Sequence, residues 1–233
     1  MQPDEYMRNF DSLGIVIPAL NAECSLPSVL KSLKDVISDN TSVIIVDDGS
    51  TDATSAVCEK FGCTIVRHSK NRGKGAALRS GFDVALQNEC DPVITLDADG
   101  QHDPSFIPTF CTEMDNSGAD IIVGNRMKST STMPMDRYLS NSISSFIVSL
   151  ACGTRISDSQ CGYRLIKANV LKNITLTTEH FETETELLIK AASAKYKFSC
   201  VSINTTYNKA SSAINRSVDT IRFIRLILKL LFN

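Results

Sequence analysis

The first half of the chain alternates short runs of apolar, β-branched residues with longer segments of helical periodicity, and this alternation limits the possible folds more than any other feature. It is typical of a parallel sheet covered by helices, because parallel strands are joined by crossover connections that are usually helical. The predicted strands cover residues 14–18, 43–47, 64–67, 92–96 and 121–124, and the predicted helices cover 25–37, 52–61, 75–86 and 104–114. The sequence therefore predicts an α/β fold with a mostly parallel central sheet, in which ligands bind at the carboxyl ends of the strands.

The pattern becomes less regular after Asn125. Residues 127–135 are rich in Ser, Thr and Met and are predicted to form a mobile loop or lid. The segments that follow are predicted as a helix over 137–151, a strand over 160–166, a helix over 182–194 and a strand over 198–206. No repeat or linker divides the chain, so we expect one domain over 1–233, with halves at about 13–125 and 126–215 and a C-terminal helix over 216–233.

Charge and cysteine content narrow the class of protein. The formal net charge of -2 gives no reason to expect a nucleic-acid partner. The eight cysteines are scattered singly without a CxxC pair, and no charged-then-apolar leader opens the chain, which favours reduced thiols and a cytoplasmic protein. No stretch reaches the roughly 20 apolar residues that a membrane-spanning helix needs, so any membrane contact is expected to be peripheral.

Two carboxylates one residue apart, Asp97 and Asp99, follow the apolar strand predicted over 92–96. Together with the amide of Gln101 they are hard oxygen ligands of the kind that hold Mg²⁺ or Mn²⁺ while leaving positions open for substrate phosphates. A bound metal would neutralise a departing diphosphate. A turn with Asx-type hydrogen bonds ahead of the helix predicted from Pro104 explains the same residues, and the spacing alone leaves both interpretations open.

A second acidic segment, residues 47–52, also follows an apolar strand and leads into a helix. Ser50 or Asp52 would cap that helix, but a cap needs only one such residue. The additional carboxylates, Asp47 and Asp48, indicate hydrogen bonding to a nucleoside, a role that acidic residues play after strands in nucleotide-binding folds. Capping and nucleoside binding remain equal alternatives.

Lys74 lies between two glycines, in a segment over 71–77 that opens the third predicted helix. Its charge near a helix N-terminus would suit the phosphates of a donor. The spacing is not that of a P-loop, and a plain loop-to-helix junction is the simpler explanation.

Cations and polar residues gather in the second half, at Arg126, at Arg137 and over 158–164. Guanidinium groups bind phosphate in a bidentate manner, which would suit an anionic acceptor. Asp158 and Glu182 are candidates either for a general base or for the ion-pair partner of an arginine. A structural ion pair is the simpler interpretation of each.

The segment over 218–232 is an apolar helix with basic residues at Arg222, Arg225 and Lys229. It fits a helix that lies in the membrane surface with its basic stripe towards anionic headgroups. Packing on the core or across a dimer is the alternative.

Five of these segments occur together in one order, over 18–21, 47–52, 97–102, 124–126 and 158–164. In this combination the chain resembles the family 2 inverting glycosyltransferases with the GT-A fold, of the dolichyl- or polyprenyl-phosphate sugar synthase type. The resemblance covers about residues 13–232. It implies the nucleotide-diphospho-sugar transferase fold of that family.

The resemblance also implies a role for each matching residue. The implied nucleotide-sugar-binding residues are Pro18, Ala19, Leu20, Asp47, Asp48, Lys74, Asp97, Ala98 and Asp99. The implied ligands of Mg²⁺ or Mn²⁺ are Asp97, Asp99 and Gln101. The implied acceptor-binding residues are Arg126, Arg137, Ser140, Gly162, Tyr163 and Arg164, and the implied catalytic residues are Asp99, Arg126, Arg137 and Asp158.

The chain departs from the family pattern at two places. Ala22 precedes Glu23 where the family often has Glu directly after the first Asn, and Ser212-Ala213 stands where the family has a Ser-Lys pair. The second departure removes a phosphate-binding cation, for which Lys209 or Arg216 would substitute.

The resemblance implies transfer of a hexose, with inversion, from a donor of the GDP-mannose or UDP-glucose type to a polyprenyl or dolichyl phosphate. It implies a membrane surface as partner, reached through the C-terminal helix or a membrane protein. A sugar hydroxyl as acceptor is the first alternative and would need a base, for which Asp158 is the candidate. A nucleotidyltransferase and a non-catalytic nucleotide-sugar-binding subunit are further alternatives.

Overall fold

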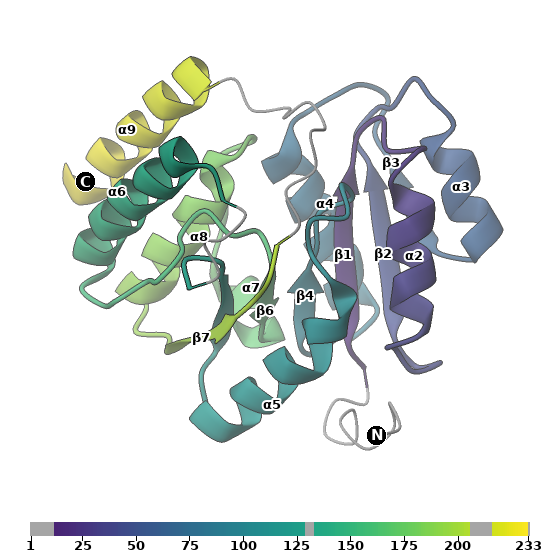
Figure 1. Ribbon diagram of the computed structural model, residues 1–233, viewed down its shortest axis with the longest axis horizontal. Helices are drawn as coiled ribbons and strands as arrows, with labels where there is room; N and C mark the ends of the chain where they lie inside the picture. Colours follow the sequence, from purple (N-terminus) through teal and green to yellow (C-terminus); the bar gives the residue numbers. More distant parts are fainter. Residues whose placement is uncertain (1–11, 129–132, 206–215, 233) are drawn as a thin grey trace.

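The computed structural model describes residues 12–128, 133–205 and 216–232. Its centre is a seven-stranded sheet in the order β3-β2-β1-β4-β6-β5-β7 (Figure 1). The strands are β1 (Gly14–Ala19), β2 (Ser42–Asp47), β3 (Thr64–Arg67), β4 (Val93–Thr95), β5 (Ile121–Asn125), β6 (Arg164–Ile166) and β7 (Phe198–Ser202). Only β6 runs antiparallel to its neighbours in this sheet. The predicted α/β fold with a mostly parallel sheet is therefore confirmed, and strands from both predicted halves share one sheet.

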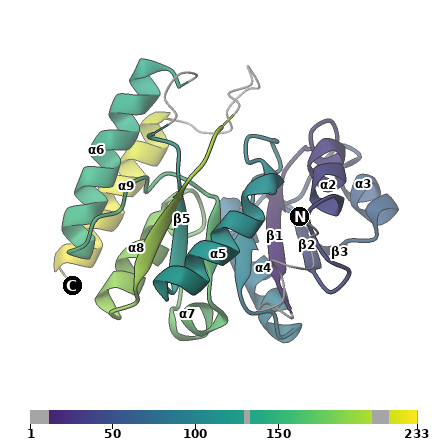
Figure 2. The same cartoon turned by 60° about the horizontal axis from the view of Figure 1, so that its bottom comes forward.

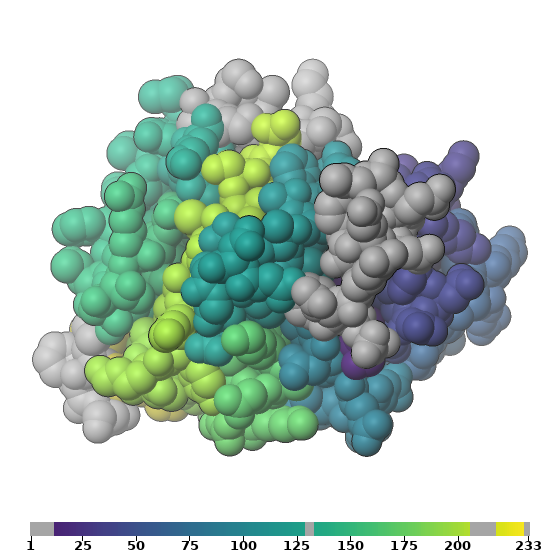
Figure 3. All heavy atoms as spheres, turned by 90° about the horizontal axis from the view of Figure 1, so that it is seen from below, coloured from purple at the N-terminus to yellow at the C-terminus, as the bar shows by residue number. Residues whose placement is uncertain are grey.

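Helices connect and cover the strands. They are α2 (Leu26–Lys34), α3 (Thr54–Phe61), α4 (Lys74–Gln87), α5 (Ile107–Ser117), α6 (Met135–Cys152), α7 (Ala168–Asn173), α8 (Glu182–Ser193) and α9 (Arg216–Phe232), with a short 3₁₀ helix η1 (Pro104–Phe106) ahead of α5. Helices α2 and α3 lie at one side of the molecule, and α6, α8 and α9 lie at the other (Figure 1). The face seen from below shows α5 between these two regions (Figure 3).

Side-chain size decides how closely the first helices approach the sheet. Helix α4 packs on β1 and β2, and a Cβ at Gly81 would overlap the side chain of Val16. Apart from the half-buried Val43, the β-branched residues of these strands are fully buried, which is the expected environment of parallel strands covered on both faces. The core is thus continuous from β2 to α4, and it holds the carboxyl ends of β1 and β2 in fixed positions.

The second half differs from its prediction in several details. The strand expected over 160–166 is limited to β6, and residues before it are buried in irregular structure. The strand expected over 198–206 ends with β7 at Ser202, and helix α7 was not predicted. Helix α6 starts at Met135, and part of the loop predicted over 127–135, residues 129–132, lies outside the described residues. The Ser-Ala departure at 212–213 also lies outside them.

Two predictions from the sequence concern the state of the cysteines and the presence of membrane-spanning helices. The eight cysteines all lie in the described part of the chain, and each is a free thiol. Within the same residues, no helix has both the length and the apolar character that crossing a bilayer requires.

A buried carboxylate, Glu186, fixes the segment that leads into α8. It is 1% exposed and accepts hydrogen bonds from the backbone and hydroxyl groups of Thr177 and Thr178, and Lys190 Nζ lies 2.6 Å from its Oε1. Burial alone would raise the pKa of Glu186, but Lys190 and these hydrogen bonds outweigh it and lower the pKa from 4.5 to about 2. Because the folded-state pKa is depressed, Glu186 stabilises the fold above about pH 5, and this stabilisation is lost as the pH falls towards about 2.

We expect Glu186→Gln to lower the free energy of unfolding near pH 7 by roughly 2–3 kcal/mol, because the buried acceptor charge is lost. The difference from wild type should shrink when urea unfolding is repeated near pH 3, because Glu186 is then protonated in the unfolded chain and folding must release that proton. Glu59→Gln, at an exposed position of α3, is the matched control. An equal difference at both pH values would contradict the assigned charge.

Candidate active site

Three segments that are far apart in the sequence meet at the carboxyl ends of β1, β2 and β4. Strand β1 pairs with β2 on one side and with β4 on the other, and Ala19 lies opposite Asp47 in the register. Beyond β1, Leu20 is 39% exposed, although Ala19 is buried. The predicted nucleotide-sugar residues of the first half therefore lie at one edge of the sheet, which is where open α/β sheets bind ligands.

Asp47 is fully buried and holds its own loop together. Its Oδ1 accepts a hydrogen bond of 2.8 Å from the backbone N–H of Ser50, its Oδ2 accepts from the hydroxyl of Ser55, and Arg67 Nε lies 3.8 Å from Oδ2. Burial alone would raise the pKa of Asp47, but the hydrogen bonds of Ser50 and Ser55 and the charge of Arg67 outweigh it and lower the pKa. Asp47 therefore fixes the loop after β2 and does not cap α3, whose N-cap Ala53 makes no side-chain cap hydrogen bond. Of the two predicted caps, Asp52 accepts a hydrogen bond from the backbone N–H of Thr54 at the start of the helix. A contact of Asp47 with a nucleoside stays a prediction.

Asp48 connects the end of β2 to the loop ahead of α4. Its carboxylate accepts hydrogen bonds from the backbone N–H groups of Arg72 and Gly73 at 2.9 and 2.8 Å. His68 Nδ1 lies 2.6 Å from Oδ1 of the same carboxylate. Asp48 is therefore a structural anchor for the loop that carries Lys74, and direct contact with the donor stays a prediction for it as well.

Lys74 lies at the centre of an ionic network with Asp97 and Glu184. Its Nζ is 2.6 Å from Asp97 Oδ1 and 3.3 Å from Glu184 Oε1. Burial alone would lower the pKa of Lys74, but the two carboxylates raise it above its ordinary value. A Cβ at Gly162 would come within 2.7 Å of Glu184 Oε1 and 3.0 Å of Lys74 Nζ, so the glycine leaves room for this network.

The glycines on both sides of Lys74 have a packing role. A side chain at Gly73 would overlap His180, and one at Gly75 would overlap Thr183. The backbone N–H of Ala76 donates to the carbonyl of Glu179 at 3.0 Å, which fixes the same contact. The glycines thus allow the segment before α8 to pack on α4, and this brings Glu184 to Lys74.

The segment from Asp97 to His102 leaves β4 and turns back on itself. The backbone N–H of Asp97 donates to His102 Nδ1 at 3.1 Å, and that of Gln101 donates to Asp99 Oδ1 at 2.9 Å. Gly100, with φ +74°, supplies the left-handed conformation of the turn. Ala98 is buried, whereas Asp99 is exposed and Gln101 is half-buried.

The charge states within this turn differ from residue to residue. Burial lowers the pKa of His102 to about 4, so its ring is neutral near pH 7 and Nδ1 is available as an acceptor. Burial alone would raise the pKa of Asp97, but the charge and hydrogen bond of Lys74 outweigh it, and with a smaller contribution from the charge of Arg126 the pKa is lowered to about 2. Asp97 is therefore ionised, and the charge of Arg126 acts on it across the site.

The chemistry of Asp97, Asp99 and Gln101 fits Mg²⁺ or Mn²⁺, because all three offer hard oxygen donors. Asp97 already places one oxygen against Lys74, whereas Asp99 has an exposed carboxylate. No group of three or more His, Cys, Asp or Glu side chains with metal-binding arrangement occurs in the described part of the chain. A site built from two carboxylates and one amide, and completed by substrate phosphates, does not require such a group.

Arg126 and Asp158 form a buried bidentate pair. Arg126 Nε is 2.7 Å from Asp158 Oδ2, Arg126 Nη2 is 2.9 Å from Oδ1, and the side chain of Asp158 is 0% exposed. Of the two roles that the sequence left open for Asp158, this geometry supports the ion-pair partner. Arg126 directly follows Asn125, the last residue of β5, and the ion pair fixes the orientation of its side chain at the end of that strand.

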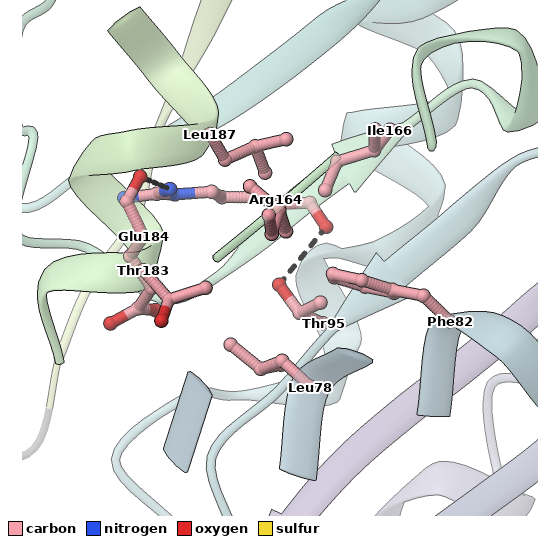
Figure 4. Close-up of a pocket in the computed structure, with 9 residues that line it drawn as sticks. Leu78, Phe82, Thr95, Arg164, Ile166, Thr183, Glu184 and Leu187 are labelled. Atoms are coloured by element: carbon pink, nitrogen blue, oxygen red, sulfur yellow. Dashed lines mark hydrogen bonds between the residues drawn. The ribbon is translucent and has the colours of Figure 1, made fainter. Parts of the chain in front are cut away.

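Tyr163 and Arg164 are buried in contacts within the protein. The ring of Tyr163 stacks on Phe110 at 4.5 Å and on His102 at 5.1 Å, and its hydroxyl donates to the carbonyl of Asp103. Arg164 is 1% exposed, and its guanidinium donates to the carbonyls of Cys161 and Ser159 at 2.8 Å each. It also donates to the carbonyl of Glu184 at 2.5 Å (Figure 4). These contacts support a scaffolding role for both side chains in place of the predicted contact with the acceptor.

Arg137 and Ser140 lie in the first turns of α6, with Arg137 half-buried and Ser140 exposed. Their predicted contact with a phosphate stays a prediction. Glu182, the other candidate base, begins α8, and its Oε2 is buried without a hydrogen-bond partner among the described residues. Glu184 was missed, because only the packing of α8 on α4 brings it to Lys74.

Solved structures with a similar fold include glucosyl-3-phosphoglycerate synthase from Mycobacterium tuberculosis in complex with UDP. It is 18% identical, with a TM-score of 0.75, and the match covers 98% of this chain and 82% of that one. The fold is thus that of GT-A-like sugar transferases, as predicted.

Residues 14–175 match the model of the family described as Glycosyl transferase family 2, and the chain belongs to this family. A UDP-N-acetylglucosamine–dolichyl-phosphate N-acetylglucosaminyltransferase of Methanococcus voltae is 31% identical, over 88% of this chain and 89% of its own length. A dolichyl-phosphate hexose transferase of Haloferax volcanii is 29% identical, over 83% and 82%. The expected resemblance is confirmed, and the protein is a glycosyltransferase.

Proposed function

We propose that the protein transfers a hexose from a nucleotide sugar of the GDP-mannose or UDP-glucose type to a polyprenyl or dolichyl phosphate, with inversion at the anomeric carbon. The observation that carries this proposal is the grouping of the Asp97–Gln101 turn with Lys74 and Arg126 at the carboxyl edge of the sheet. Relatives at about 30% identity are named as transferases to dolichyl phosphate, which supports the acceptor class.

The donor diphosphate belongs at the Asp97–Gln101 turn in this proposal. Asp99 and Gln101 would be the principal ligands of Mg²⁺ or Mn²⁺, with Asp97 held against Lys74 beside them. When bound, the ion would neutralise the charge of the departing nucleoside diphosphate. A structure of the Mycobacterium tuberculosis protein with Mn²⁺ and UDP supports the choice of ion for this fold. The exposed Leu20 and the loop fixed by Asp48 would border the nucleoside.

The burial of Asp158 bears on the choice of acceptor. A hydroxyl acceptor needs a general base, but both oxygens of Asp158 are occupied by Arg126. A phosphate monoester is largely ionised near neutral pH, because its second pKa is about 6, and it attacks without a base. Arg126 and Arg137 would position that anion. The geometry of Asp158 therefore favours a phosphate acceptor. The location proposed for the enzyme, from its sequence, is the cytoplasm at the membrane surface.

The test compares acceptors that differ only in the phosphate. Labelled nucleotide sugars are incubated with Mn²⁺ or Mg²⁺ and with either a short-chain polyprenyl phosphate or the corresponding polyprenol, and lipid-linked label is measured. The proposal predicts label on the phosphate and none on the alcohol. Label transferred only to sugar hydroxyls, with polyprenyl phosphate inert under all donors, would favour the hydroxyl-acceptor alternative.

A further inference from the structure

Glu184 is a carboxylate in the first turn of α8 to which the proposed function gives no role. Its Oε1 lies 3.3 Å from Lys74 Nζ, and both side chains are largely buried, with Glu184 13% and Lys74 15% exposed. Helix α8 lies towards the side of the molecule opposite α2 and α3 (Figures 1 and 2), so this contact joins the second half of the chain to the start of α4. The buried Arg164 donates to the backbone carbonyl of Glu184 (Figure 4), which fixes the start of α8 in this position.

Lys74 is shared between two carboxylates. Besides Glu184, its Nζ contacts Asp97 Oδ1 at 2.6 Å. In the described part of the chain these are the only two carboxylates that pair with Lys74. A buried ammonium needs a carboxylate partner, because an uncompensated buried charge is strongly destabilising. With two such partners, Lys74 stays compensated when one of them binds another cation.

The contact between Lys74 and Asp97 competes with the predicted role of Asp97 as a metal ligand. The ammonium occupies one carboxylate oxygen of Asp97 and holds a positive charge beside it. A divalent ion on the same carboxylate would be repelled by that charge, and the repulsion is strong in a site that is partly shielded from water. The affinity of the turn for the ion therefore depends on how readily Lys74 gives up Asp97.

We propose that Glu184 is a positioning residue that takes over the charge of Lys74 when Asp97 binds the divalent ion of the donor. This inference rests on the proposed function and adds Glu184 to its site. Without the ion, Lys74 compensates the charge of Asp97. With the ion bound, Glu184 is the remaining partner of Lys74, so that neither group is left buried without a counter-charge. Gly162 leaves room for the exchange, because a Cβ there would crowd Lys74, Asp97 and Glu184 alike.

The experiment measures the affinity of the full chain for Mn²⁺ at a fixed concentration of UDP, from the electron paramagnetic resonance signal of free Mn²⁺. Glu184→Gln keeps the size of the side chain but leaves Asp97 as the only carboxylate partner of Lys74. It should weaken Mn²⁺ binding by about 10–100-fold, the range typical when a partner outside the ligand set is removed. Glu179→Gln removes an exposed carboxylate just ahead of α8 and is the matched control. It should bind Mn²⁺ like wild type.

A Lys74→Gln background separates action through Lys74 from the plain loss of a negative charge near the ion. If Glu184 acts through Lys74, adding Glu184→Gln to Lys74→Gln should weaken Mn²⁺ binding by no more than about 2–3-fold. Both variants of this comparison lack Lys74, so any contact of Lys74 with UDP is absent from both. Equal weakening with and without Lys74 would overturn the inference.

A purely structural ion pair gives a different pattern. Glu184→Gln would then lower the melting temperature of the metal-free protein and leave the affinity for Mn²⁺ at the wild-type value, which would also overturn the inference. That result would leave the proposed function intact, because wild type would still bind Mn²⁺ with UDP. Absence of Mn²⁺ binding by wild type would instead reject the proposed metal site together with the role of Glu184.

Discussion

Asp99→Asn should lower kcat for sugar transfer by about 10²–10³-fold, the effect expected when one group that stabilises transition-state charge is lost. Asp99 has an exposed carboxylate at the Asp97–Gln101 turn, beside the Lys74 network. Asn keeps the size of the side chain and an acceptor for the backbone N–H of Gln101, but it removes the charge that a divalent metal requires. The melting temperature should change little, because the side chain is at the surface of the site. Initial rates of transfer at saturating donor measure the effect.

A control for Asp99→Asn is Asp83→Asn, which removes an exposed carboxylate from α4. It should keep wild-type kcat. Adding excess Mn²⁺ should restore part of the lost activity of Asp99→Asn if weakened metal binding is the cause. Wild-type turnover by Asp99→Asn at limiting metal would show that this carboxylate does not hold the ion.

Asp158→Asn should have its largest effect on stability. Removing one partner of a buried ion pair costs about 3–5 kcal/mol, because the remaining charge stays buried and uncompensated. In a domain of this size that corresponds to roughly 6–20 °C in melting temperature. Arg126 should also lose its fixed orientation, so that the KM for the acceptor rises. Calorimetry and acceptor titration measure the two effects.

A double-mutant cycle separates pairing from base catalysis. Arg126→Met/Asp158→Asn should be less destabilised than the sum of its single variants, because the pair is then removed as a unit. A general base would behave differently: Asp158→Asn would melt like wild type, and kcat would fall steeply while the KM for the acceptor stayed constant. That second pattern would contradict the role assigned to Asp158.

The first half of the fold was predictable because each buried strand is an uninterrupted apolar run that ends at a polar residue. The second half was less predictable because burial there is not confined to strands. Residues such as Ser159 and Cys161 are buried in irregular structure ahead of β6 and resemble a strand in sequence. Helix α7 is short, and its buried residues Ala168 and Val170 give too little periodicity to detect.

The sequence predicted the position of the acidic turn better than it predicted the contacts of individual side chains. The position of Asp97 after a buried strand predicted an acidic turn at the edge of the sheet, and the structure has one there. Glu184 has no local signal, because its proximity to Lys74 depends on the packing of α8 on α4 through Gly73 and Gly75. Arg164 is the opposite case. It is prominent in the motif and was predicted to bind the acceptor, but its guanidinium donates to backbone carbonyls inside the protein.

The most direct test of the account is the binding of a metal-bound nucleotide diphosphate at the Asp97–Gln101 turn, followed as a thermal shift of wild type and Asp99→Asn. A ligand at about 100 times its Kd stabilises the folded state by about 2.7 kcal/mol, which corresponds to roughly 5–10 °C here. Wild type should show this shift with UDP or GDP in the presence of Mn²⁺ and a much smaller one without it, and Asp99→Asn should show neither. An equal shift without metal, or an unchanged shift in Asp99→Asn, would contradict the account.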